Sequence, residues 1–435
     1  MRSVAVVGLG YVGLPLAVQA AEKGYEVTGI DLTPPLVEMV NKRQSPFVSD
    51  PRFEKALEAA KPSSLRATTK FDGLKDVDNI IICVPTPTKN NVPDISYVLK
   101  AANQIASQLR PGQFVALEST VNPGVTRDQV LPILEKVSGL KVGQDFCLAH
   151  CPERIDPGNA KFFVGNLNRV VGGITEECTR RAVDFYKSII DAEVIPLGST
   201  EEAEFVKSWE NTQRNVMIAL ANTAAIICDS MDMNIDNVLE GLQSKIDQFS
   251  LELATPGIGP GGHCIPEDIH YVIKKARQNG IDTRFLDDAT ELNDKMPSYA
   301  VHNFATMISD NGENLANMNV ALLGMAYKPN IADLRRSPSI EVGYKLVRQA
   351  KSVILHDTYN LPAEVIKGAK TIQTLEEALA AADTVFIGTA HDEYVKRLTP
   401  QALKKHGIRY VFDGRNCLDR EAITAVGIRY KGIGK

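Results

Sequence analysis

The sequence predicts an α/β protein in which two doubly wound domains are joined by a long helix and a helical middle domain. The first observation is that residues 1–31 read as strand, glycine-rich turn, helix and strand, the order of a parallel βαβ unit. The second is a stretch from 201 to 232 with apolar residues at helical spacing and no glycine or proline, which predicts one long helix. The third is that strand-like runs return from residue 318 onward. We therefore expect three domains, at residues 1–198, 199–312 and 313–435.

Length and composition exclude several classes of protein. A chain of 435 residues is too long for one hydrophobic core, so two or three domains are expected. The net charge of -5 and the lack of long like-charge runs argue against nucleic acid as a partner. No apolar run reaches the roughly 18 residues of a membrane span, and the first residues lead into a strand rather than a signal peptide, so we expect a cytoplasmic protein with no membrane partner. The seven cysteines show no C-x-x-C spacing, which favours reduced thiols over a disulfide framework or a metal site.

The amino terminus predicts a dinucleotide site. A β-branched run at 3–7 leads into a G-x-G-x-x-G turn and a helical pattern, and the next strand, at 26–30, ends in Asp31. The turn supplies Gly8, Gly10, Tyr11, Val12 and Gly13. Its glycines permit a tight turn, close approach to a pyrophosphate and close helix–strand packing, and the following helix N-terminus favours phosphate. Asp31 would accept hydrogen bonds from a ribose diol and repel a 2′-phosphate, so we expect a Rossmann-like domain that binds NAD rather than NADP.

Polar residues follow three further predicted strands of this domain. The strands, at 79–84, 113–117 and 146–150, lead into loops that contain Thr86, Thr120 and Glu153. Because ligands of a doubly wound sheet lie beyond the carboxyl ends of its strands, these side chains are candidates for the binding crevice. The alternative for each threonine is a turn or cap residue, and for the glutamate an exposed loop acid.

The long predicted helix carries Lys207 and Asn211, which lie four residues apart and so on one face. Taken alone, a lysine on a helix is usually solvated. A helix of this length favours a spine that joins domains or pairs subunits. Further helices are predicted at 235–246, 266–278 and 283–311.

A glycine-rich segment at 257–268 contains one thiol, Cys264, and ends in Asp268. Glycines around a thiol leave it open to a ligand and close to backbone N–H groups that can hold a developing negative charge. Cys264 is therefore a candidate covalent nucleophile. The alternative is one more inert, buried cysteine.

The last part of the chain repeats the α/β pattern. Strands are predicted at 319–323, 352–356, 384–388 and 410–412. A helix at 337–349 begins with Ser337 as its cap and Pro338 at its first position. Lys328 and Arg335 follow the end of a strand, where they would suit phosphate oxygens; surface charge is the alternative.

These motifs together resemble the UDP-glucose/GDP-mannose dehydrogenase family, whose members oxidise the C6 hydroxymethyl group of a nucleotide sugar to a carboxylate. The resemblance covers nearly the whole chain. Its motifs are G-L-G-Y-V-G-L-P at 8–15, V-P-T-P at 84–87, S-T-V-N-P-G at 119–124, C-P-E-R at 151–154, A-E-F-V-K-S-W-E-N-T at 203–212, G-G-H-C-I-P-E-D at 261–268 and K-P-N…D-L-R-R-S-P at 328–338. The resemblance implies NAD as cofactor, a UDP-sugar as substrate and a homodimer formed through the central helix.

The resemblance also implies catalytic roles. Cys264 matches the nucleophile, and Lys207 and Asp268 match the pair that serves the alcohol oxidation and the oxyanion. Asn211 matches a polar partner near the same oxygen. In the implied reaction C6 loses its first hydride as a base takes the hydroxyl proton, Cys264 adds to the aldehyde, and a second oxidation leaves a thioester that water cleaves.

Other matching residues concern hydrolysis and binding. Glu153 matches the base for thioester hydrolysis, and Thr120 a residue that positions the water. Lys328 matches a ligand of the sugar-nucleotide phosphates, and Arg335 a residue on the cofactor side. The expected substrate-binding residues are Glu153, Lys207, Asn211, Gly261, Gly262 and Lys328. Thr86, Thr120 and Arg335 join the glycine-turn residues and Asp31 in the expected cofactor-binding set.

The residues around the thiol bear on the choice of sugar. His263 before Cys264 and Ile265 after it resemble the branch that acts on UDP-N-acetylhexosamines (GlcNAc or ManNAc), whereas UDP-glucose enzymes usually have serine and phenylalanine there. Two features depart from that branch: Lys245 is the only base in 241–262, where many relatives have an arginine, and Glu267 lies beside the site. Three alternatives stay open: a UDP-glucose 6-dehydrogenase, a two-electron dehydrogenase of the hydroxy-acid type, and a non-catalytic protein that binds nucleotide sugars.

Overall fold

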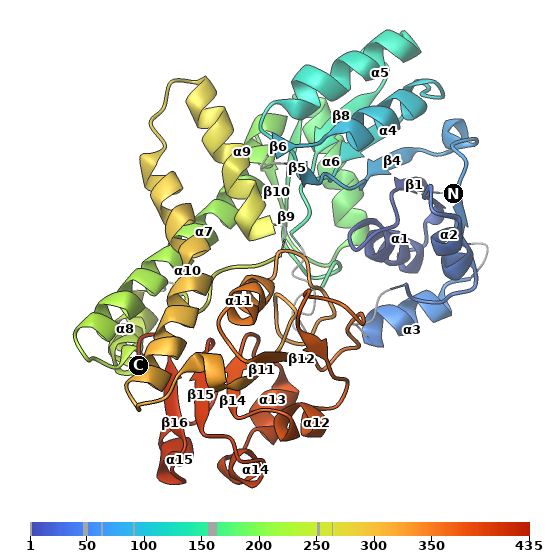
Figure 1. Cartoon of the computed structure of the whole chain (residues 1–435). Helices are drawn as coiled ribbons and strands as arrows, with labels where there is room; N and C mark the ends of the chain where they lie inside the picture. Colours follow the sequence, from blue (N-terminus) through green and yellow to red (C-terminus); the bar gives the residue numbers. More distant parts are fainter. Residues whose placement is uncertain are drawn as a thin grey trace. The chain divides into compact units, whose positions relative to one another are not determined.

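The computed structural model describes residues 2–46, 51–61, 64–89, 92–154, 163–249, 253–262 and 264–435. The chain divides into two compact units. Unit 1 comprises Met1–Glu210 and His270–Gly280, and unit 2 comprises Asn211–Ile269 and Ile281–Lys435. Each unit contains a largely parallel sheet with helices, which confirms the predicted fold class (Figure 1). Within the described ranges, no helix is long and apolar enough to cross a membrane.

The sheet of unit 1 has the doubly wound strand order. In space the strands run β10, β9, β8, β7, β4, β1, β2, β3. Their bounds are β1 Ser3–Val7, β2 Glu26–Ile30, β3 Leu65–Thr68, β4 Asn79–Ile82, β7 Phe114–Leu117, β8 Cys147–His150, β9 Arg169–Gly173 and β10 Val194–Leu197; a separate hairpin pairs β5 Thr88–Lys89 with β6 Val92–Pro93. The pairings are parallel except that β8 and β9 are antiparallel. From β1 the chain adds β2 and β3 on one side and then crosses to add β4 on the other side. A doubly wound sheet binds its ligand at this change of direction.

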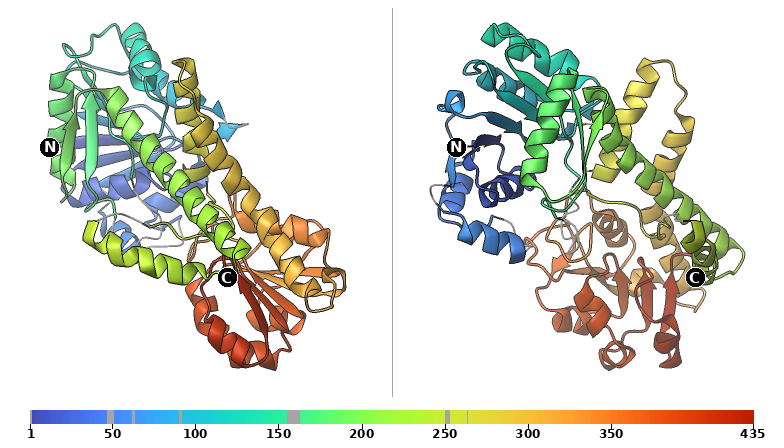
Figure 2. Two further views of the ribbon diagram at one scale, coloured as in Figure 1. Left: turned by 90° about the vertical axis from the view of Figure 1, so that its left-hand side faces the viewer. Right: turned by 180° about the vertical axis from the view of Figure 1, so that it is seen from behind.

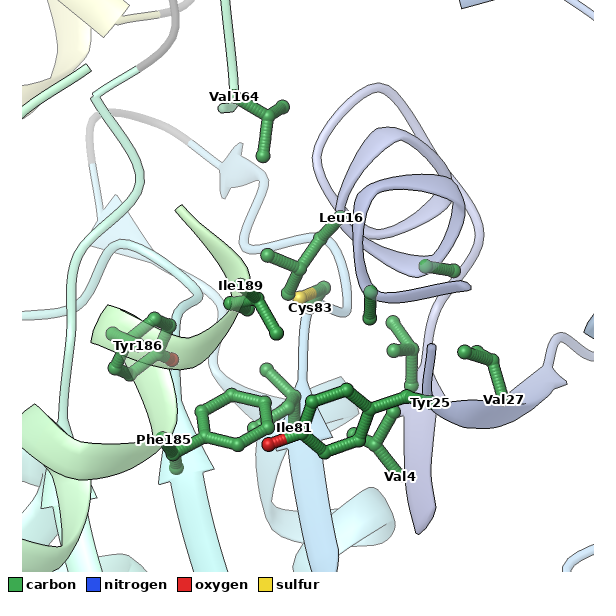
Figure 3. Packing of buried hydrophobic residues seen from close by; sticks show 14 of the residues in the cluster. Val4, Leu16, Tyr25, Val27, Ile81, Cys83, Val164, Phe185, Tyr186 and Ile189 are labelled. Carbon is green, nitrogen blue, oxygen red and sulfur yellow. The ribbon is translucent and has the colours of Figure 1, made fainter. Parts of the chain in front are cut away.

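Helices cover both faces of this sheet. They are α1 Gly13–Glu22, α2 Pro34–Asn41, α3 Pro51–Ala59, α4 Ser96–Ala106, α5 Leu131–Ser138 and α6 Glu176–Ile189. Successive residues of a strand point to opposite faces, so Val4 of β1 packs in a cluster with α1 and α6 while Ala5 packs with α4 and α5. Figure 3 shows the first cluster, where the rings of Tyr25 and Phe185 meet edge to face with centroids 5.7 Å apart. Burial on both faces explains why these strands are apolar runs without alternation.

Unit 2 repeats the same topology. Its strands run β13, β12, β11, β14, β15, β16 in space, all parallel. Their bounds are β11 Asn319–Leu323, β12 Ser352–His356, β13 Lys370–Thr371, β14 Thr384–Ile387, β15 Tyr410–Asp413 and β16 Arg429–Gly432. Val320 faces a cluster with α10 and α11, and Ala321 faces one with α12, α13 and α14. The helices are α8 Ile235–Phe249, α10 Arg284–Ser309, α11 Pro338–Val347, α12 Leu375–Ala380, α13 Asp392–Arg397, α14 Pro400–Lys405 and α15 Arg420–Ala425.

Two of the three boundaries between the units lie within helices. The predicted long helix is α7, Thr200–Ser230, and Figure 2 shows it as one uninterrupted green helix. The other is α9, Cys264–Gln278. This helix was predicted at about 266–278, and in the structure it begins two residues earlier, at Cys264. Pro266 is tolerated so near the start because the first N–H groups of a helix have no acceptor within it.

Candidate functional site

The glycine-rich turn after β1 is shaped by three different constraints. Gly8 has φ of +95°, and a Cβ there would lie 2.6 Å from the carbonyl oxygen of Cys83. A Cβ on Gly13 would lie 1.9 Å from the carbonyl oxygen of Gly8. A Cβ on Gly10, by contrast, would meet no atom within 4 Å. The first and last glycines are therefore needed by the fold itself, whereas Gly10 borders open space that a ligand backbone can approach.

The surroundings of this turn fit a dinucleotide. Helix α1 has no side-chain cap at Val12 and no acidic residue in its first turn, so its N-terminal N–H groups and partial positive charge suit a pyrophosphate. At the end of β2, Asp31 accepts hydrogen bonds from the backbone N–H of Leu9 and of Thr33, each at 2.9 Å. Each carboxylate oxygen of Asp31 keeps a further lone pair for a ribose hydroxyl. The Tyr11 side chain is half exposed beside the turn.

The loops after β4 and β7 are tied together. Ser119 donates a hydrogen bond to the carbonyl oxygen of Val84 at 2.7 Å, which links the loop of Thr120 to the loop of Thr86. The carbonyl oxygen of Thr86 in turn accepts from the hydroxyl of Tyr271 at 3.4 Å. Thr86 and Thr120 are both half-buried. These contacts hold both threonines beyond the carboxyl ends of neighbouring strands, as expected.

A buried glutamate that the sequence analysis did not identify fixes the second of these loops. Glu204, near the start of α7, accepts hydrogen bonds from Gly124 N at 2.6 Å, Thr126 N at 2.8 Å and Thr126 Oγ1 at 2.6 Å. Burial raises the pKa of Glu204 to about 7, although these three bonds act in the opposite direction. No feature of the sequence distinguished it, because the neighbouring positions on this face of α7 are polar as well: Thr200, Glu201, Lys207 and Ser208.

Glu153 does not lie exposed in its loop, which was the alternative weighed for it. Its side chain is only 7% exposed, and Oε2 forms an ion pair with Arg169 Nη2 at 2.8 Å. The other oxygen accepts a hydrogen bond from the backbone N–H of Arg154 at 2.6 Å. The guanidinium of Arg154 pairs in turn with Glu210 of α7. Glu153 is thus an ordered carboxylate with charged neighbours, a suitable candidate for a general base.

Helix α7 carries Lys207 in unit 1 and Asn211 in unit 2. Lys207 is half-buried. The amide of Asn211 donates a hydrogen bond to Asp268 Oδ2 at 2.6 Å, and both side chains are buried. Asp268 lies one turn after Cys264 on α9, so within unit 2 the structure brings the thiol, the carboxylate and the amide onto two adjoining helices.

The thiol itself lies at a helix terminus. Cys264 is the first residue of α9 and is half-buried, so the partial positive charge of the helix favours its thiolate. The preceding glycines have a packing role as well as the predicted substrate role. A Cβ on Gly261 would lie 2.7 Å from Tyr327 Cβ, and one on Gly262, where φ is +79°, would lie 2.8 Å from Tyr327 Cε2.

Three asparagines that the sequence analysis did not single out support this region of unit 2. Asn215 on α7 donates to the carbonyl oxygen of Ile265 at 3.3 Å, and Asn293 on α10 donates to the carbonyl oxygen of Asn215 at 3.0 Å. Asn222 donates to Asn293 Oδ1 at 3.0 Å and accepts from Gly257 N at 2.9 Å. We call Asn215, Asn222 and Asn293 the asparagine ladder. It joins α7, α10 and the segment before the thiol, and its signal in the sequence was asparagine at positions 215 and 222, two turns apart on one helix.

The remaining expected site residues lie in loops or on exposed faces of unit 2. Lys328 is half-buried after β11. Arg335 is exposed, and its Nε donates hydrogen bonds to both carboxylate oxygens of Asp333, each at 3.0 Å. Glu267 pairs with Arg336 at 3.1 Å, so its charge beside the thiol is balanced. Lys245 is exposed on α8. His263 lies outside the described residues.

The described residues contain no group of three or more His, Cys, Asp or Glu side chains that could hold a metal ion. The candidate residues of the two units are a thiol, carboxylates and a lysine. These are the groups that acid–base and covalent catalysis use.

Comparisons with known proteins find family models along most of the chain. The NAD binding domain of the UDP-glucose/GDP-mannose dehydrogenase family matches residues 2–190, its central domain matches 201–295 and its UDP binding domain matches 321–420. A UDP-N-acetyl-D-mannosamine dehydrogenase of Pyrococcus horikoshii is 32% identical over 434 residues, 99% of both chains. One of Salmonella typhimurium is 31% identical and covers 94% of this chain and 98% of its own.

Solved structures agree. The UDP-D-ManNAc dehydrogenase of Pyrococcus horikoshii matches with a TM-score of 0.90 and 30% identity over 100% of this chain and 99% of that one. A UDP-glucose dehydrogenase of Pyrobaculum islandicum matches with a TM-score of 0.85 and 27% identity over 100% and 98%.

Proposed function

Because the chain belongs to the UDP-glucose/GDP-mannose dehydrogenase family, it is an NAD-dependent nucleotide-sugar dehydrogenase, and we propose that it oxidises C6 of a UDP-N-acetylhexosamine to the carboxylate. UDP-N-acetylmannosamine is the first candidate. The observation that carries this choice is the match, over nearly the whole chain, to relatives named for that substrate. The His263–Cys264–Ile265 sequence supports an N-acetylhexosamine as well. The division into domains at 1–198, 199–312 and 313–435 is part of the proposal and is supported by the bounds of the three family models.

The alcohol oxidation is assigned to Lys207, Asp268 and Asn211. When bound at Gly8, Gly10 and Asp31, NAD supplies the hydride acceptor. Lys207 and Asp268 together remove the hydroxyl proton and stabilise the developing oxyanion. The 2.6 Å hydrogen bond from Asn211 fixes the orientation of the Asp268 carboxylate, so that little reorganisation accompanies the proton transfer.

The second half of the reaction is assigned to Cys264, Glu153 and Thr120. The thiolate of Cys264 adds to the aldehyde carbon to form a thiohemiacetal, and loss of the C6 hydride to a second NAD, bound at the same glycine turn, would leave a thioester. Glu153 then takes a proton from water as the water oxygen bonds to the acyl carbon, and the C–S bond breaks with its electron pair on sulfur. Thr120 positions that water.

The test is turnover of a panel of UDP-sugars with NAD by the wild-type chain and three variants. We expect two NADH per UDP-N-acetylmannosamine in the wild type, and no UDP-uronic acid from Cys264→Ala, in which the aldehyde cannot proceed to the thioester. Glu153→Gln should give a burst of NADH and then a slow rate, and intact-protein mass spectrometry should show an acyl adduct on Cys264. Cys417→Ala, another half-buried thiol of unit 2, should behave as the wild type. Full activity of Cys264→Ala would falsify the thioester mechanism.

The same panel separates the competing functions. UDP-glucose is the substrate in the name of the Pyrobaculum islandicum relative. A preference for it would change the proposed substrate and leave the proposed mechanism as it is. One NADH per substrate would indicate a two-electron dehydrogenase. Binding of UDP-sugars with no NADH formed would indicate a non-catalytic binding protein.

A further inference from the structure

Unit 1 contains a buried ionic cluster that includes the proposed general base. The cluster consists of Arg169, the first residue of β9, with Glu118 after β7 and Glu153 after β8. Arg169 Nη2 lies 2.8 Å from Glu153 Oε2, and Arg169 Nη1 lies 3.4 Å from Glu118 Oε2. The side chains of Arg169 and Glu118 are fully buried. One guanidinium therefore serves two carboxylates in a site that excludes solvent.

The other oxygen of each carboxylate is held as well. Tyr186 of α6 donates its hydroxyl to Glu118 Oε1 at 2.7 Å, and Arg154 N donates to Glu153 Oε1 at 2.6 Å. Figure 3 labels Tyr186 in the cluster of buried residues. Each carboxylate thus accepts a hydrogen bond from a neighbouring group and lies within ion-pair distance of the shared cation.

The charges of this cluster do not balance unless one proton is retained. The nearby thiols of Cys83 and Cys151 and the phenol of Tyr186 have raised pKa values because of burial, and so stay neutral. Burial raises the pKa of Glu118 to about 7; Arg169 acts to lower it and the charge of Glu153 to raise it. The Glu118 carboxyl therefore gains or loses its proton near neutral pH.

We propose that Glu118 and Arg169 are positioning residues that orient Glu153 and set the pH range in which it accepts a proton from the hydrolytic water. The inference rests on the proposed function, in which Glu153 is the base for thioester hydrolysis. When Glu153 takes the proton of water, its carboxylate loses its negative charge. The positive charge of Arg169 is then still balanced if Glu118 is ionised. The ionised Glu118 therefore favours proton transfer to Glu153, and Arg169 opposes it.

This arrangement predicts opposite effects for two substitutions. Glu118→Gln removes one negative charge, so the Arg169 cation pairs with ionised Glu153 alone. Glu153 therefore becomes a weaker base. The acid limb of the pH profile of kcat should move down by about one pH unit, and kcat on the plateau should fall about tenfold. In Arg169→Met, the cation is removed, and the acid limb should move up. A merely structural loss would lower the rate in both variants without moving the limbs in opposite directions.

The experiment measures kcat, KM and the acylated fraction as functions of pH for the wild type and five variants, with UDP-N-acetylmannosamine and NAD. We expect Glu118→Gln to accumulate acyl-enzyme on Cys264 with KM for the UDP-sugar changed less than twofold. Arg169→Lys keeps the charge and should restore most of the wild-type profile, and Tyr186→Phe is expected to move the acid limb even if Arg169→Met fails to fold. Glu177→Gln, an exposed glutamate of α6, is the matched control.

The outcomes distinguish this inference from the proposed function. An active wild type whose acid limb and acylated fraction are unchanged in both Glu118→Gln and Tyr186→Phe overturns the role of the cluster and leaves the proposed function intact. A wild type that forms no NADH from any UDP-sugar overturns both. Opposite displacement of the acid limb in Glu118→Gln and Arg169→Met supports the inference.

Discussion

At the scale of single residues, several side chains that suit the chemistry also hold the local backbone. Asp31 is the clearest case, because its two oxygens bind the N–H groups of Leu9 and Thr33. The carboxylate thus fixes the glycine turn in the shape that leaves Gly10 open. Gly8 and Gly13 are required by contacts within the turn even without a ligand. A dinucleotide fingerprint is therefore partly a folding requirement.

Asp31→Asn should reduce the preference for NAD over NADP. The substitution removes a charge that accepts hydrogen bonds from a ribose diol and repels a 2′-phosphate, a hydrogen bond to a charged group being worth about 1.5–3 kcal/mol. We expect kcat/KM for NAD to fall about tenfold or more and the value for NADP to rise. Steady-state kinetics with both cofactors measure this, with the exposed Asp72→Asn as control. Equal use of both cofactors by the wild type would contradict the assignment.

At the scale of elements, α7 organises polar groups of both units. Its first turns place Glu204 against the loop after β7, and its later turns carry the asparagine ladder next to the thiol segment. Buried polar groups are stabilising only when their partners are present. The length of α7 is thus used to position loops that are far apart in the sequence.

Glu204→Gln should change how stability depends on pH. Because the pKa of Glu204 in the folded protein is raised from 4.5 to about 7, its stabilising contribution is complete below pH 4.5 and is lost as the pH rises through about 7. The free energy of unfolding of the wild type, relative to that of Glu204→Gln, should fall by up to about 3 kcal/mol between about pH 5 and about pH 8. Denaturant unfolding at several pH values measures it.

The exposed Glu202→Gln is the control for this experiment. It lies two residues earlier on the same helix and should leave the pH dependence of unfolding as in the wild type. A constant difference between the wild type and Glu204→Gln at all pH values would show that Glu204 does not titrate in this range.

At the scale of the whole molecule, the chain uses one topology twice. Each sheet reverses its winding beside its first strand, β1 or β11. In each, an aspartate after the second strand binds backbone N–H groups of the loop after the first: Asp31 holds Leu9, and Asp357 holds Met325 at 2.6 Å. The two loops of this kind belong to the matches for the NAD binding and UDP binding domains, respectively.

We expect the chain to form a homodimer through α7. Apolar side chains repeat along this helix at intervals of about one, three and two turns, and all are 42% exposed or more: Phe205, Trp209, Leu220 and Ile227. The rings of Phe205 and Trp209 stack with centroids 5.3 Å apart. A long apolar stripe on one helix is typical of an interface between copies. Light scattering should give twice the chain mass of 47.5 kDa, and Leu220→Glu with Ile227→Glu should lower it toward one chain.

The exposed Val395→Glu on α13 serves as the control, because it adds the same charge to a different helix. A wild type that remains monomeric at micromolar concentration would contradict the expected dimer.

The sequence by itself determined the fold class and the dinucleotide turn, and it supplied the candidates for the reactive groups. These depend on local patterns: β-branched runs for buried parallel strands, glycines where a backbone must turn sharply, and a helix free of glycine and proline. The N-cap of α11 is a local pattern too, and Ser337 and Pro338 lie where they were predicted.

Only the tertiary structure decided which polar residues form hydrogen bonds and ion pairs with each other. Glu118 lies 51 residues from Arg169, Glu204 lies 80 residues from Gly124 and Asn222 lies 71 residues from Asn293. No periodicity connects such pairs, because their contacts arise when strands and helices distant in the chain pack together. The same holds for Glu153. Its position in a loop was compatible both with a place in the binding crevice and with an exposed side chain. Its burial against Arg169 is a property of the assembled sheet, since β8 and β9 must pair before the carboxylate meets the cation.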